Sequence, residues 1–218
     1  MDGYLIVNIL AALLILTSLL VVLTKAPRRA AYIYGAQAIV IVGMLVTLGV
    51  LTNSTELFTW AGAAFVTKVI LVPTMVLVAL NKMKIGKDEK SASTISPVVS
   101  IVVIAAEVFL CFLAVTNIHL PTALEVKPAL AISLAHFFIG LTCIITQRNI
   151  VKQIFGYCLM ENGSHISLAL LAPQAPEVVE IGIATDAVFA VLIMVIMVVR
   201  VYRSTHTLDS SQIMNDKG

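Results

Sequence analysis

Six ionisable side chains lie inside long apolar stretches, and they are the residues of this sequence that could do chemistry. The chain has 218 residues, of which 60% are hydrophobic and only 12% are charged. A charge in apolar surroundings is costly unless it is paired, and burial or a neighbouring charge can move its pKa toward neutrality. Such groups can pass protons along a relay. The candidates are Lys68, Glu107, His136, Glu161, His165 and Asp186.

The same residues also allow a simpler interpretation, in which each one is a paired structural group that holds two helices together. His136, which is followed by Phe137 and Phe138, fits a packed role as well as a relay role. Six titratable groups spread over five apolar segments nevertheless favour the relay, because adhesion alone rarely needs so many.

The stretch GYCLMENGSH, residues 156–165, concentrates several of these groups. Cys158, Glu161 and His165 are spaced at i, i+3 and i+7, so a helix would place them on one face with Asn162 beside them. A Glu and a His one turn apart can share a proton. Asn-Gly is typical of a turn in water, but the apolar residues after it are too few to span a membrane alone. We therefore expect this polar seam to lie inside a helix.

Two further candidates have informative neighbours. Asp186 follows Gly182 and other small residues, which predicts a tightly packed face rather than exposure to lipid. Lys68 is followed by Pro73, which should free a backbone carbonyl and kink the helix. Such a kink fits an ion path and a local packing adjustment equally well.

The elements that must position these residues are membrane helices. The mean hydropathy is +1.03, and apolar runs of about 20 residues, each long enough to cross the hydrocarbon layer, recur along the chain. The sequence predicts an all-α, polytopic membrane protein with seven transmembrane helices. Their approximate ranges are 4–24, 30–51, 56–80, 95–117, 127–147, 150–172 and 178–202.

The loops between these segments alternate between basic and non-basic, and twelve of the fourteen Lys and Arg residues fall on one side. By the positive-inside rule, this predicts an N-terminus outside and a C-terminus in the cytoplasm. The basic residues on that side are Lys25, Arg28, Arg29, Lys82, Lys84, Lys87, Lys90, Arg148, Lys152, Arg200, Arg203 and Lys217. The opposite loops carry Glu56, Glu125, Lys127, Glu177 and Glu180.

Other classes of chemistry find little support. Cys111, Cys143 and Cys158 lie in apolar runs without CxxC spacing, which argues against a disulfide framework, an iron–sulfur motif or a metal site. The basic residues are spread among short loops and do not predict binding to nucleic acid. The composition predicts that the chain is embedded in a phospholipid bilayer, which is its partner.

The segment RNIVKQIFGYCLMENGSHISLAL resembles the second helix of the K-type subunit of respiratory complex I and of the C-type subunit of multi-subunit sodium/proton antiporters. Arg148, Asn149, Gly156 and Asn162 match the pattern of that family. The membrane glutamate of the family falls on Cys158, so the resemblance implies that Glu161, three positions later, takes over its role.

The segment IGIATDAVFAVLI resembles the third helix of the same family, whose carboxylate aligns with Asp186. Residues 127–203 therefore resemble a K-type module of three helices. Residues 1–80 form a weak repeat of that module, joined to it by the helix at 95–117. We expect a single transmembrane domain over residues 1–203, followed by a polar cytoplasmic tail at 204–218.

The whole chain resembles the hydrogenase-4 component E family, the membrane subunits of [NiFe] hydrogenase complexes of the formate hydrogenlyase type. The resemblance implies a multi-pass subunit of the bacterial inner membrane, packed among antiporter-like and other membrane subunits. It implies no cofactor and no catalytic centre in this chain, because nickel–iron and iron–sulfur centres are expected in partner subunits. Proton translocation coupled to electron transfer is the implied role. The alternatives are an assembly subunit that conducts nothing, a subunit of a cation/proton antiporter, and a transporter that works alone.

Overall fold

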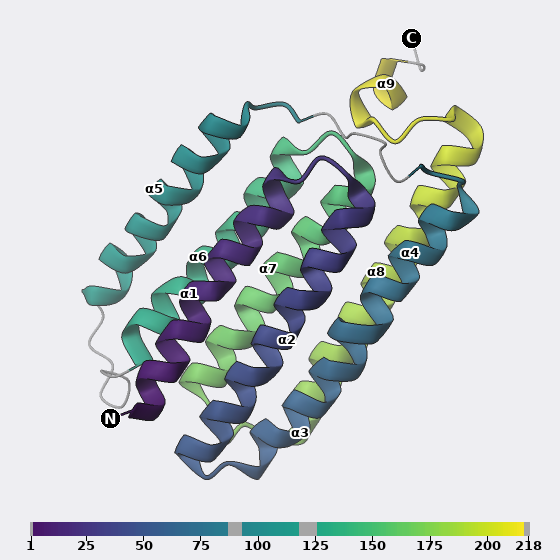
Figure 1. The fold of residues 1–218 in the computed structure, drawn as a ribbon. Helices are drawn as coiled ribbons and strands as arrows, with labels where there is room; N and C mark the ends of the chain where they lie inside the picture. The colour runs from purple at the N-terminus through teal and green to yellow at the C-terminus, as the bar shows by residue number, and fades with distance from the viewer. Residues whose placement is uncertain (1, 87–92, 118–125, 216–218) are drawn as a thin grey trace.

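The computed structural model describes residues 2–86, 93–117 and 126–215, and in these ranges the chain is helical without named strands. Figure 1 shows long helices that run side by side from one end of the molecule to the other. The elements are α1 (Asp2–Leu23), α2 (Pro27–Thr52), α3 (Thr55–Ala64), a π-helical segment η1 (Phe65–Leu71), α4 (Val72–Lys82), α5 (Pro97–Thr116), α6 (Lys127–Thr146), α7 (Ile150–Leu171), α8 (Glu177–Thr205) and α9 (Ser210–Asn215).

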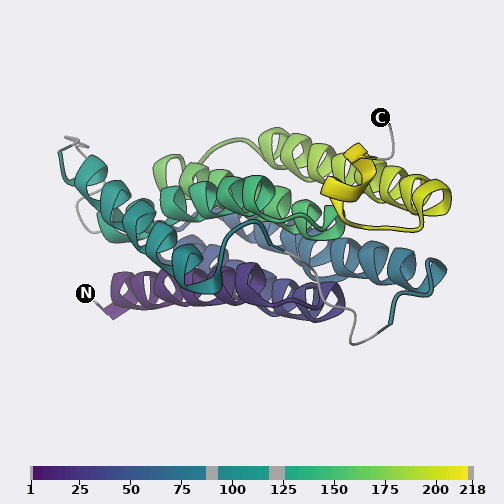
Figure 2. The same ribbon diagram turned by 90° about the horizontal axis from the view of Figure 1, so that it is seen from above.

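The long helices form two layers with α5 at their side. Figure 2 shows α1 and α2 with the α3–α4 helix in one layer and α6, α7 and α8 in the other. Across the layers α1 packs on α6, α2 packs on α7, and both α3 and α4 pack on α8. Helices at corresponding positions of the two triplets run in the same direction (Figure 1). The weak repeat of residues 1–80 and 127–203 stays a prediction.

Helix starts and stops follow local sequence signals. Pro27 and Pro97 occupy the first turn of α2 and α5, where a missing N–H costs nothing. The side chain of Asn149 accepts hydrogen bonds from the backbone N–H groups of Val151 and Lys152 and so caps α7. Asn53, at φ 51°, ends α2 in the left-handed conformation that Asn tolerates. Because lipid offers no hydrogen bonds, these ends lie at the rims of the bundle.

The closest contact in the fold joins α6 and α7 through glycines. A Cβ atom added to Gly163 would lie 2.5 Å from the backbone nitrogen of Phe137, and one added to Gly156 would lie 2.9 Å from the carbonyl oxygen of Gly140. Small residues let helix backbones approach in this way inside a membrane. The Ser133 hydroxyl, 2.8 Å from the Ser167 hydroxyl, adds a hydrogen bond across the same contact.

The predicted seam at residues 156–165 is confirmed as helical, since α7 continues through Asn162 and Gly163 without a break. Seven helical segments match the predicted ranges to within a few residues. Six of them are long and apolar enough to cross a membrane, and α7 is not among these six. Polar residues lower the hydropathy of α7, which is nevertheless as long as α1 and packs along α6. The count of seven spans and the orientation stay predictions.

Connections that carry the predicted basic residues gather at one end of the bundle (Figure 1). There Arg28 donates a 2.7 Å hydrogen bond to the side chain of Asn81 and a second one to the backbone of Ile85. Lys152, predicted in a loop, instead lies buried in the first turn of α7. Four residues of the predicted charge pattern lie outside the described residues: Lys87, Lys90, Glu125 and Lys217.

The polar tail folds back on the same end of the bundle, which its composition did not predict. The backbone N–H of Ile150 donates to the carbonyl of Leu208, and Ser210 donates to Arg148. Hydrogen bonds from Ser211 hold the pKa of Asp209 below its usual value at the start of α9. The tail is thus fastened to the loop between α6 and α7.

We predict that Gly163→Ala destabilises the protein by about 1–3 kcal/mol, because backbone atoms of α6 occupy the space that the new methyl group needs. The measurement is the thermal unfolding midpoint of the purified chain in detergent. Gly62→Ala is the matched control, since it also lies in a helix and nothing lies within 4 Å of its added Cβ. Equal midpoints for the two variants would contradict close α6–α7 packing.

Candidate functional site: a buried polar seam between the layers

The centre of the site is an ion pair between the two layers. Lys68 in η1 donates to Glu161 Oε2 at 2.5 Å and to Asn162 Oδ1 at 2.8 Å, both on α7. The Lys68 side chain is 2% exposed and that of Glu161 is 13% exposed. An ammonium group needs a counter-charge and hydrogen-bond acceptors at this depth, and Glu161 and Asn162 supply them. Tyr34 of α2 neighbours Asn162 and Cys158.

The helix that carries Lys68 changes its hydrogen-bonding register at this point. Residues Phe65–Leu71 form a π-helix, and the backbone N–H of Val72 donates to the carbonyl of Thr67, five residues back. Pro73 follows at the start of α4 and has no N–H to continue the ladder. A π-helical turn, a feature that often marks functional sites, thus lies directly before Pro73, while the predicted kink stays a prediction.

A second group of polar side chains joins α1, α2 and α6. Gln37 Nε2 donates to the Ser18 hydroxyl at 2.8 Å, and that hydroxyl lies 2.7 Å from His136 Nδ1. All three residues are fully buried. The charge of Lys68 is close enough to act electrostatically on the His136 ring. His136, a relay candidate in the sequence prediction, thus lies in a buried polar group with Ser18 and Gln37, which were not candidates.

A third group pairs His165 of α7 with Glu180 of α8. His165 Nε2 lies 2.7 Å from Glu180 Oε2, but the pair is not aligned as a hydrogen bond. Both side chains are buried, and the ring of Trp60 lies against His165 with centroids 5.4 Å apart. The sequence prediction placed Glu180 in a loop and missed this pair. The sequence did contain a signal for the burial of Glu180. Glu180, Ala184 and Ala187 are spaced at i, i+4 and i+7, as on one face of a helix, and all three are buried.

Several buried atoms along the seam have no hydrogen-bond partner among the described residues. Buried polar atoms are nearly always paired, and water is the smallest group that can bridge them. The seam thus has a row of polar atoms able to bind water between its three groups. These atoms are Gln37 Oε1, His136 Nε2, Glu161 Oε1, Asn162 Nδ2, His165 Nδ1 and Glu180 Oε1.

The structure separates four of the predicted site residues from their expected surroundings. Glu161 and His165 pair with Lys68 and Glu180 rather than with each other. Asp186 lies on an exposed face of α8. The small residues Gly182 and Thr185 are exposed with it, and they are not packed against another helix as the sequence predicted. Glu107 accepts a hydrogen bond from Thr142 on α6, and its helix packs chiefly on α6 and α1, away from Lys68.

Within the described residues, no three His, Cys, Asp or Glu side chains gather in a way that could hold a metal ion. The three cysteines are free and buried. The seam presents carboxylate, imidazole and ammonium groups, all of which are able to bind a proton.

Comparison with known proteins identifies the relatives of this chain. Residues 128–217 match the family NADH-ubiquinone/plastoquinone oxidoreductase chain 4L. Proteins named Hydrogenase-4 component E from Escherichia coli K12, Escherichia coli O157:H7 and Shigella flexneri are each 46% identical to it over 175 residues, which is 80% of this chain and 80% of theirs. The chain belongs to the hydrogenase-4 component E family. No solved structure gave a significant match.

The family membership gives the motif residues of α7 a physical explanation. Asn149 caps the helix, Gly156 permits the contact with α6, and Asn162 binds Lys68. Cys158, at the position where the K-type pattern has a glutamate, is buried beside Tyr34. The carboxylate of this component E-family chain that meets Lys68 is Glu161, one turn further along α7.

We predict that Lys68→Met destabilises the protein by about 3–5 kcal/mol, because it leaves the buried Glu161 without its cation. Adding Glu161→Met to this variant should recover a large part of the loss, since no buried charge then remains in the pair. The measurement is a double-mutant cycle on thermal unfolding midpoints in detergent. Additive effects of the two substitutions would contradict a coupled pair.

We predict that Glu180→Gln lowers the unfolding midpoint by several degrees, because the buried carboxylate faces His165. Glu177→Gln, one turn earlier on the exposed face of α8, should leave the midpoint unchanged and serves as the matched control. A midpoint of Glu180→Gln equal to that of the control would show that the pair contributes nothing to the fold.

Proposed function

We propose that this chain is an integral membrane subunit of a hydrogenase-4-type complex and that its buried protonatable residues take part in proton translocation. The relatives named Hydrogenase-4 component E support the first part. The ion pair between Lys68 and Glu161, closed off between two layers of helices, is the observation that carries the second part. Electron transfer, with its nickel–iron and iron–sulfur centres, belongs to partner subunits in this proposal.

The three groups of protonatable residues in the seam lie one after another along the length of the bundle and so offer a route for protons. Glu180 and His165 lie toward the end of the bundle where α8 begins, Lys68 and Glu161 lie near the middle, and His136 follows toward the end of α1. A proton that reaches Glu161 neutralises it and weakens its hold on Lys68, so the ammonium can release its own proton onward. His165 lies one helical turn from Glu161, and both side chains have buried atoms without a partner among the described residues, so we place a bridging water between them.

Asp186 and Glu107 stand apart from this route, and we assign Asp186, on an exposed face of α8, to a contact with a neighbouring membrane subunit. A carboxylate on an outward membrane face is costly in lipid unless a partner supplies a donor or a cation. Antiporter-like subunits in the bacterial inner membrane are the partners that we propose.

The decisive experiment measures proton pumping in inverted membrane vesicles that contain the assembled complex. With Glu161→Gln, we expect the number of protons pumped per electron transferred to fall at least tenfold. The reason is that a Gln side chain at position 161 cannot take up the proton that Glu161 accepts beside Lys68. Glu177→Gln, on the exposed face of α8, should pump normally. Normal pumping by assembled complexes that carry Glu161→Gln would rule out the relay.

An assembly role is the second candidate, because the Lys68–Glu161 pair also fastens the two layers together. In that case Glu161→Gln should reduce the amount of complex recovered from the membrane, while the complexes that do form keep their full pumping ratio. Measuring recovery and pumping on the same vesicles separates the two functions.

A further inference from the structure

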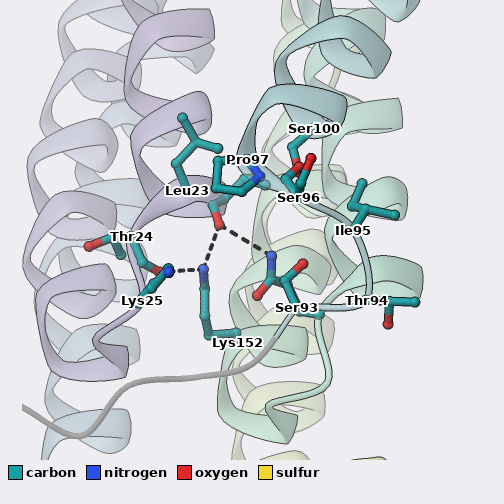
Figure 3. A pocket seen from close by; sticks show the side chains of 12 residues that line it. Leu23, Thr24, Lys25, Ser93, Thr94, Ile95, Ser96, Pro97, Ser100 and Lys152 are labelled. Atoms are coloured by element: carbon teal, nitrogen blue, oxygen red, sulfur yellow. Dashed lines mark hydrogen bonds between the residues drawn. The ribbon is translucent and has the colours of Figure 1, made fainter.

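A pocket of about 330 Å³ opens at the basic end of the bundle, away from the polar seam. It lies where α1 ends, α5 begins and the loop between α6 and α7 turns (Figure 3). Apolar side chains form part of its lining, and the polar lining includes Lys25, Ser96, Ser100, Gln147 and Lys152. Among the described residues that line it there is no Asp or Glu.

Lys152 supplies the chemistry of this pocket. The residue is 1% exposed, and its Nζ donates hydrogen bonds of 2.6 Å to the carbonyls of Val22 and Thr24. An ammonium group has three N–H donors, so one is left to face the pocket. Within the described part of the chain Lys152 forms no salt bridge. A buried cation without a counter-charge is costly, and an anion in the pocket would relieve that cost.

The surroundings of Lys152 are arranged for an anion rather than a cation. Gln147 Nε2 donates to the carbonyl of Val22, so this carbonyl at the end of α1 already has two donors (Figure 3). The helix α5 starts at the pocket with its positive dipole end, and Ser96 caps it there. Together with Lys25, these features make the pocket positive.

The position of the pocket selects the kind of anion. It lies at the ends of α1 and α5, two helices long and apolar enough to cross a membrane, so we expect it at the level of the phospholipid headgroups. On the adjoining turns of α1 and α5, apolar side chains are exposed, including Leu20 and Val99 at 46% each. An acyl chain can lie against such surfaces while the phosphate group enters the pocket.

We propose that this pocket binds the phosphate group of an anionic phospholipid, with Lys152 as the central ligand. The bound lipid neutralises the buried ammonium and ties the end of α1 to the start of α5.

The test compares lipid binding by the full-length chain purified in detergent. Phosphatidylglycerol should raise the thermal unfolding midpoint by several degrees more than phosphatidylcholine, and native mass spectrometry should find it retained. Lys152→Gln keeps donors for the two carbonyls but loses the charge, and it should bind phosphatidylglycerol at least tenfold more weakly. Ser100→Leu, which fills the pocket from α5, should do the same and decides the question if Lys152→Gln does not fold. Lys82→Gln removes an exposed charge at the same end and should bind normally.

Equal stabilisation by the two lipids, or unchanged binding in both pocket variants, would overturn the proposal. Stabilisation by inorganic phosphate alone, equal to that by phosphatidylglycerol, would assign the pocket to a soluble anion and overturn the lipid assignment. Lipid binding that appears only in the Asp88→Asn/Glu89→Gln variant would show that the chain supplies its own counter-charge, and would also overturn it.

Discussion

The need to neutralise one buried ammonium group governs the centre of this molecule. Lys68 lies at mid-length of the α3–α4 helix, buried away from bulk solvent, and its charge must be met inside the bundle. Glu161 and Asn162 meet it from the opposite layer. This requirement fixes the rotation of α7 about its axis, and the π-helical turn in η1 adjusts Lys68 to the same contact. A rotation of either helix would leave a charge facing lipid or apolar side chains.

The glycine contact between α6 and α7 complements this constraint. Because Gly140, Gly156 and Gly163 let the two backbones meet, the polar face of α7 can turn toward the first layer while its small face rests on α6. This explains why α7 is the least apolar of the long helices. Its polar residues find partners within the protein, and so it needs less hydrophobicity than helices that face lipid.

The outward faces of α5 and α8 have a different character. They expose large apolar side chains such as Val102, Phe109, Ile181 and Phe189, which suits lipid or neighbouring subunits. Asp186 interrupts the apolar face of α8 with a carboxylate that has no partner within the described chain. The inner face of α8, with Glu180, completes the seam, so this helix has polar groups on both sides.

The sequence by itself determined the helices and the alternation of their connections. Apolar runs of sufficient length, Pro and Asn at helix starts, and loops of alternating charge suffice for this, because a membrane admits few alternatives to a helix. It also singled out Lys68, His136, Glu161 and His165 as buried polar residues. Only the tertiary structure decided which groups meet. Glu161 pairs with a residue 93 positions earlier in the chain, and His165 pairs with Glu180 from a predicted loop. Asp186 turned outward although small residues surround it in sequence. Such pairings depend on how helices pack against one another. The spacing of residues within a single helix can indicate which face is buried, but it does not identify the residue of another helix that this face meets.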